Sequence, residues 1–148
     1  MENFDAINRY KWVYLSKIKE TQENRLLLEV KQSISADFPI QKNKREVQSG
    51  AEDWVDQSKT FFTISFDRYV SYHVINESYA KPNPLTEYVA GDYSTFCIFP
   101  RSSYMNYILQ ETFADEIYPS ELRHYCLFAA NHVVQVISMY EPRIVKHT

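Results

Sequence analysis

The clearest alternation of apolar and polar side chains in this chain runs from Thr60 to Ile75 and reads TFFTISFDRYVSYHVI. Because successive side chains of a β-strand point to opposite faces, this period of two predicts extended structure with one buried face. A break at Asp67-Arg68 predicts either one long bent strand or a hairpin that turns there. The residues expected to face the core are Phe62, Ile64, Phe66, Val70, Tyr72 and Val74.

Strand-like segments also precede and follow this stretch. Residues 11–18 (KWVYLSKI) and 25–34 (RLLLEVKQSI) flank a polar connection at 19–24, which predicts an antiparallel hairpin with a fairly long loop. Leu and Glu also allow a helix at 25–31, but its short length favours the strand. Three further short strands are expected over 94–99, 123–130 and 133–139, the last two forming a hairpin that turns at Asn131-His132.

One helix is expected, over about 103–114. Ser102 can cap its N-terminus, and Pro119 closes the segment beyond its end. Its apolar residues recur at three-and-four spacing, and they are Met105, Ile108, Leu109 and Phe113. The order of elements predicts an α+β fold, with a mostly antiparallel curved sheet of about six or seven strands and this helix packed on it. The chain is expected to form a single domain over 1–148, with a long polar loop at 35–58.

The glycine content excludes several nucleotide-binding chemistries. The 148 residues include 12 Tyr and 9 Phe but only 2 Gly, Gly50 and Gly91. A phosphate-binding loop needs several closely spaced glycines so that backbone N–H groups can approach the ligand. We therefore expect no P-loop, no dinucleotide fingerprint and no cofactor.

Two cysteines, Cys97 and Cys126, lie in apolar strand-like segments. A free cysteine in such a segment behaves as a small buried hydrophobe, so we expect free thiols rather than a disulfide or a nucleophile. No stretch approaches eighteen apolar residues, and residues 1–10 hold no apolar run that could serve as a signal peptide. A cytoplasmic location without membrane association is expected.

Charge is unevenly distributed along the chain, whose net charge is −3. Nucleic-acid binding needs a basic stripe, which is not evident, so no nucleic-acid partner is expected. Over residues 82–121 Arg101 is the only cation, and a charged partner is therefore expected to be basic. The carboxylates of this segment are Glu87, Asp92, Glu111, Asp115, Glu116 and Glu121.

The densest group of titratable and hydroxyl side chains is SYHVINES, residues 71–78. His73 beside Glu77 could act as a general base, with a serine as nucleophile or hydrogen-bonding partner. No G-x-S-x-G elbow accompanies them, which favours a polar sheet face in water. A metal site is not expected, because His124 and His132 would lie far apart on one hairpin. The candidate catalytic residues are Ser71, His73, Glu77 and Ser78.

These features are typical of a small soluble interaction protein of the bacterial immunity or antitoxin kind, which binds a protein partner and catalyses nothing. Tyrosine suits such interfaces, because its ring contributes buried area and its hydroxyl keeps a polar contact. The expected partner-binding residues are Tyr88, Asp92, Tyr93, Asp115, Glu116 and Tyr118. The alternative is a small-molecule-binding or hydrolytic domain that uses the polar sheet face around His73 and Glu77.

Overall fold

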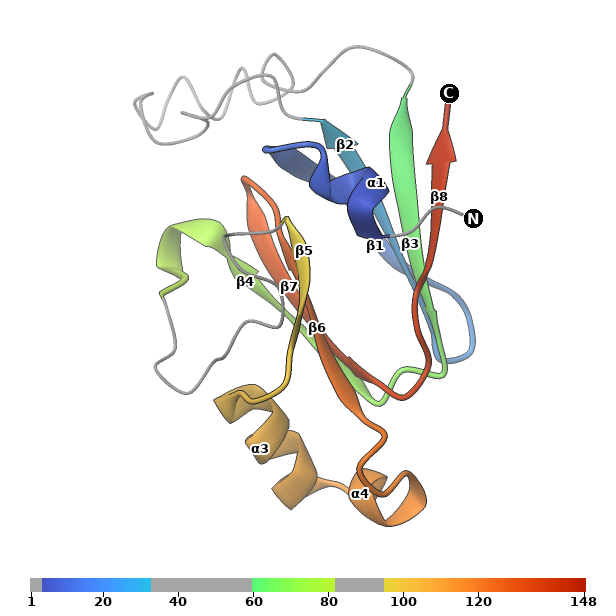
Figure 1. Ribbon diagram of the computed structural model, residues 1–148, viewed down its shortest axis with the longest axis vertical. Coiled ribbons are helices and arrows are strands. Elements are labelled where there is room, and N and C mark those ends of the chain that lie inside the picture. The colour runs from blue at the N-terminus through green and yellow to red at the C-terminus, as the bar shows by residue number, and fades with distance from the viewer. Residues whose placement is uncertain (1–3, 33–59, 82–94) are drawn as a thin grey trace.

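The computed structural model describes residues 4–32, 60–81 and 95–148, which form two four-stranded antiparallel sheets (Figure 1). The first sheet has the order β1-β2-β3-β8, with β1 Val13–Gln22, β2 Arg25–Gln32, β3 Phe61–Asp67 and β8 Arg143–His147. The second has the order β4-β7-β6-β5, with β4 Ser71–Asn76, β5 Phe96–Phe99, β6 Arg123–Phe128 and β7 His132–Ser138. The helices are α1 Phe4–Asn8, the short 3-10 helix η2 Glu77–Tyr79, α3 Ser103–Glu111 and α4 Ala114–Ile117.

The main core lies between the two sheets. Alternate residues of each strand point inward, as the period of two requires, and the buried cluster takes side chains from both sheets. The short helix α1 lies at one end between the sheets (Figure 1), where Phe4 packs edge-on against Phe96 at 5.0 Å between ring centroids. The larger inward-facing residues are Leu26, Leu28, Phe62, Ile64, Phe66, Phe96, Tyr125, Leu127 and Ile144.

The α+β class with mostly antiparallel strands is confirmed, but the expectation of one sheet with six or seven strands is wrong. A hairpin at Asp67-Arg68 is also wrong, because β3 and β4 belong to different sheets. Arg68 has a positive φ of 52°, and the chain bends there from one sheet to the other. Beyond the bend, Tyr72 packs against the core between the sheets, whereas Val70 packs with the cluster beneath α3. Only Val74, on the edge strand β4, is exposed among the six predicted core positions.

Both predicted hairpins are present. β1 pairs with β2 and β6 pairs with β7, and both pairs are antiparallel. The first turn is tighter than expected, because strand pairing extends to Gln22 and Arg25 and Asn24 takes a positive φ of 57°. An unpredicted strand, β8, follows Pro142 and completes the first sheet beside β3.

The predicted helix over 103–114 is also divided. α3 ends at Glu111, Thr112 is extended, and α4 begins at Ala114. The Thr112 hydroxyl donates to the Ile108 carbonyl at 2.7 Å and accepts from the Ala114 N–H at 3.2 Å. A threonine side chain thus replaces helical backbone bonds at this point. The break turns Phe113 away from the buried stripe to which its spacing assigned it.

Two asparagines satisfy backbone groups at strand edges. Asn131, in the turn between β6 and β7, accepts from the Leu15 N–H at 3.0 Å and donates to the Leu15 carbonyl at 2.9 Å. Asn8 makes the same two-way contact with Phe96 of β5, at 2.7 and 2.9 Å. Each side chain occupies the place of a neighbouring strand on an edge that would otherwise be unpaired.

Candidate functional site

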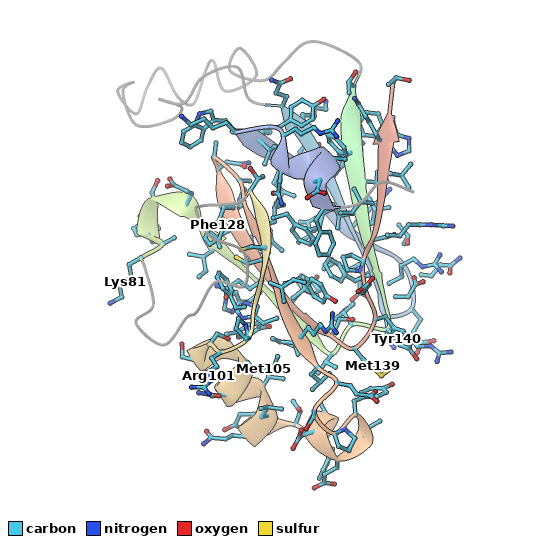
Figure 2. The ribbon with its side chains drawn as sticks, in the orientation of Figure 1. Lys81, Arg101, Met105, Phe128, Met139 and Tyr140 are labelled. Atoms are coloured by element: carbon cyan, nitrogen blue, oxygen red, sulfur yellow. The ribbon has the colours of Figure 1, made fainter. Side chains whose placement is uncertain are left out.

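The outer face of the second sheet carries two rows of side chains that include histidines and cysteines. In register across its four strands lie His73, Gln135, Cys126 and Cys97 in one row, and Ser71, Ile137, His124 and Phe99 in the next. Helix α3 packs on part of this face through Met105 and Ile108, which contact Ile137. Arg101, just before α3, and Met105, in its first turn, mark the N-terminal end of this helix in Figure 2.

His124 joins this sheet to the N-terminus of α3. Its Nδ1 lies 2.6 Å from the Ser102 hydroxyl, which also accepts the Met105 N–H at 3.0 Å as the helix N-cap. The side chain is 1% exposed, and burial is the main reason why the pKa of His124 falls to about 4. His124 is therefore neutral at pH 7 and serves as a hydrogen-bonding anchor for the helix.

His73 and Tyr104 extend this polar group. Their rings lie 4.1 Å apart, and the Tyr104 ring is also 5.4 Å from that of His124. The Tyr104 hydroxyl shares a hydrogen bond of 2.8 Å with the Ser71 hydroxyl. Burial lowers the pKa of His73 and raises that of Tyr104. Neutral imidazoles and a protonated phenol thus attach α3 to the strands beneath it.

The structure does not bring the four candidate catalytic residues together. Glu77 and Ser78 lie in η2, and no hydrogen bond or ion pair within the described residues joins either to His73. The Glu77 N–H donates to the Asn131 carbonyl at 3.2 Å, and the Ser78 N–H donates to the Asn76 side chain at 3.0 Å. Ser71 bonds to a tyrosine rather than to the histidine, so the observed contacts provide no pair of base and nucleophile.

The acidic aromatic surface is described only in part. Asp115 and Glu116 are exposed on α4, and Tyr118 is half-buried at its C-terminus, where its N–H donates to the Ala114 carbonyl at 2.8 Å. The predicted contact residues Tyr88, Asp92 and Tyr93, and the polar loop at 35–58, lie outside the described residues.

Apolar side chains that the sequence reasoning missed lie beside these acids. Phe113 is 74% exposed, Ile117 64% and Tyr107 58%. Phe113 and Ile117 are one helical turn apart, and the Ile117 N–H donates to the Phe113 carbonyl at 3.2 Å. The threonine at 112 was the available signal that the apolar stripe ends before Phe113. We define the α3–α4 surface as Tyr107, Glu111, Phe113, Asp115, Glu116 and Ile117.

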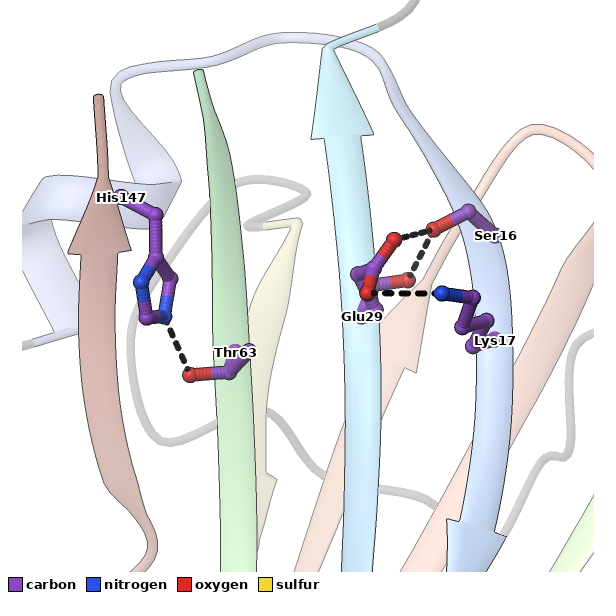
Figure 3. Close-up of polar contacts among 5 residues, drawn as sticks. All are labelled: Ser16, Lys17, Glu29, Thr63 and His147. Carbon is purple, nitrogen blue, oxygen red and sulfur yellow. Dashed lines mark hydrogen bonds and ion pairs between the residues drawn. The ribbon is translucent and has the colours of Figure 1, made fainter. Parts of the chain in front are cut away.

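The outer face of the first sheet has a second polar group (Figure 3). Glu29 accepts from the Ser16 hydroxyl at 2.9 Å and pairs with the Lys17 ammonium at 3.6 Å. On the neighbouring strands, Thr63 and His147 share a hydrogen bond of 3.0 Å. These are cross-strand pairs on a half-exposed sheet, each satisfied by its neighbour, and they stabilise the sheet modestly.

An open groove of about 620 Å³ lies where the turns between strands meet at one end of the sheets. Arg25 and Asp67 form an ion pair across it at 2.5 Å, and Tyr140 lines it from the turn between β7 and β8 (Figure 2). The side chains that line the groove include both acids and arginines, so neither an anionic nor a cationic ligand is favoured. Within the described part of the chain, no cluster of three or more His, Cys, Asp or Glu side chains could hold a metal ion.

Comparisons of the chain with protein-family models, with curated proteins and with solved structures gave no match. Among the residues that the structure describes, no helix is long and apolar enough to cross a membrane.

Proposed function

We propose that the protein acts by binding another protein through the α3–α4 surface. The observation that carries the proposal is the exposure of Phe113 and Ile117, 74% and 64%, on the same turn as two carboxylates. Apolar side chains that cluster on a surface among charges are typical of interaction sites, where an aromatic residue supplies the anchor and charges form the rim.

Helix α3, which carries part of the α3–α4 surface, is firmly held on the second sheet. Ser102 caps α3 and bonds to the buried His124, while Met105 and Ile108 pack against the second sheet. The Thr112 hydroxyl then bonds to both sides of the break between α3 and α4. A partner would therefore meet side chains on helices that are already positioned, and binding would cost little ordering entropy.

The charge of the surface favours a basic partner. Glu111, Asp115 and Glu116 are exposed, and none of the ion pairs found among the described residues involves them. Their field would steer a segment rich in Lys or Arg, and a partner apolar side chain would then bury against Phe113. This proposal keeps the functional class expected from the sequence, a small interaction protein of the immunity or antitoxin kind.

A photo-crosslinking amino acid at position 107 tests the proposal directly. We expect crosslinks in the native cell to one protein, at a peptide rich in Lys or Arg, because Tyr107 belongs to the α3–α4 surface. The same amino acid in place of Tyr79, which is 81% exposed in η2, is the matched control and should give no such crosslink.

Substitutions then test the contribution of each chemistry to binding of the purified partner. Phe113→Ser should weaken binding about tenfold or more, as expected for an anchor in an interface. Asp115→Lys with Glu116→Lys should slow association and remove its salt dependence, whereas Glu20→Lys with Glu23→Lys on the first hairpin should not. Equal crosslinking at positions 107 and 79 would refute the proposal. Unchanged affinity of both Phe113→Ser and the double lysine variant would also refute it.

A further inference from the structure

Two free cysteines face each other on the outer face of the second sheet. Cys97 of β5 and Cys126 of β6 are direct cross-strand partners. Their side chains are 4% and 1% exposed and share a small buried cluster with Phe99 and Val133. Neither thiol takes part in the contacts that attach α3 or form the α3–α4 surface.

The backbone places the pair within reach of a disulfide. The Phe128 N–H donates to the Thr95 carbonyl at 2.8 Å, and in an antiparallel ladder the same pattern recurs two residues along. Cys97 and Cys126 are therefore a hydrogen-bonded pair, for which the Cα atoms lie about 5.5 Å apart. Disulfides span Cα separations of about 4.4–6.8 Å.

The side chains must move slightly to form the bond. Opposed Cβ atoms in a sheet lie about 4.5–5.5 Å apart. A disulfide favours about 3.8 Å, so the bond would draw β5 toward β6 and store strain. Strained disulfides are reduced more readily than relaxed ones. The geometry therefore favours a reversible bond over a permanent structural one.

We propose that Cys97 and Cys126 are a redox pair that forms a reversible disulfide by exchange with a small-molecule disulfide such as oxidised glutathione. The Cys97 thiolate attacks one sulfur of oxidised glutathione, which forms a mixed disulfide and releases one reduced glutathione. The Cys126 thiolate then attacks the Cys97 sulfur, which forms the protein disulfide and releases the second glutathione. Each protein thiol loses its proton to solvent or to a departing thiolate, and the two electrons end on the glutathione pair.

The order of the two attacks follows from the sheet. β5 has four residues and, among the residues that the structure describes, pairs with β6 alone, so local opening exposes Cys97 first. Cys126 lies on β6 between two strands, and burial together with the Cys97 thiol raises its pKa well above the usual value. Cys126 is thus slow toward a dissolved oxidant and suited to attack a mixed disulfide held beside it.

The bond would also join the two ends of the segment that contains α3 and α4. Residues 97 and 126 flank both helices, so the disulfide would hold the base of the segment closed even when β5 opens. Oxidation would therefore leave the α3–α4 surface tethered to the second sheet.

The test uses the folded full chain in buffers with increasing ratios of oxidised to reduced glutathione. Remaining thiols are alkylated, and intact mass and peptide mapping follow. In the wild type we expect a peptide linking Cys97 to Cys126, without glutathione adduct, that disappears after dithiothreitol treatment. Cys126→Ser should stop at a glutathione adduct on Cys97, because the resolving thiol is absent. Cys97→Ser should leave Cys126 unmodified over the same time.

Three results would overturn the inference. These are wild-type thiols that both stay free at every ratio, a lasting glutathione adduct in the wild type, and a Cys97→Ser variant modified as fast as Cys126→Ser. Circular dichroism of each variant before oxidation shows whether it is folded. If a serine variant is unfolded, the corresponding alanine variant replaces it.

Discussion

The free energy of unfolding should decrease steeply as the pH falls, because the imidazole of His124 is buried. The substitution His124→Gln tests this. The pKa of this buried imidazole is about 4 in the folded protein, against 6.5 as its ordinary value. Between these values the unfolded chain binds more protons, so the free energy of unfolding decreases as the pH falls from about 6.5 to about 4. The difference between the two pKa values corresponds to about 3 kcal/mol at most.

Urea unfolding followed by circular dichroism between pH 7.5 and 4 measures this effect. The difference in free energy of unfolding between wild type and His124→Gln cancels the other titrating groups. We expect this difference to shrink by roughly 3 kcal/mol as the pH falls across the stated range.

Ser102→Ala is the matched control for the hydrogen bond to His124. It removes the helix N-cap at a cost of about 1 kcal/mol at every pH, but it keeps the burial that is the main cause of the shift. The dependence on pH should therefore persist in this variant. Parallel curves of stability against pH for wild type and His124→Gln would refute the assignment of His124 as a buried neutral anchor.

Three substitutions and one control variant test the architecture by urea unfolding at pH 7. Phe66→Ala should destabilise by about 3–5 kcal/mol, because its fully buried ring lies between the two sheets; a cost below 1 kcal/mol would contradict that placement. Asn131→Ala should cost about 1–3 kcal/mol, since it leaves the N–H and carbonyl of Leu15 without their side-chain partners, whereas Asn76→Ala in the exposed η2 cap should cost less. Phe113→Ser should change stability by less than about 0.5 kcal/mol, and a large loss would show that its ring is buried after all.

Local periodicity identified most of the strands. The alternation over Thr60 to Ile75 places Phe62, Ile64 and Phe66 in the core, as predicted, because side-chain direction in a strand depends only on position along the chain. Turn residues such as Asn131 likewise located the hairpin between β6 and β7. The period of two could not reveal that the chain changes sheets at Arg68, since both sheets face one core and the parity is the same.

The missed elements are those whose neighbours decide their conformation. β8 is five residues long and is a strand because β3 offers it an edge, which no local pattern encodes. α3 stops at Glu111 because the Thr112 hydroxyl takes over backbone bonds, although the apolar spacing continues to Phe113. That single break separates a buried helix face from the exposed side chains on which the proposed function rests.

The sequence by itself determined the α+β class, the buried face of the long alternating stretch, and the presence of two free buried cysteines. Tertiary structure alone decided which side chains meet: His124 with Ser102, Tyr104 with Ser71, and Cys97 with Cys126. The physical reason is that side-chain direction and turn propensity are properties of a few consecutive residues. Pairing between strands that lie far apart in the chain depends on how all of them share one core.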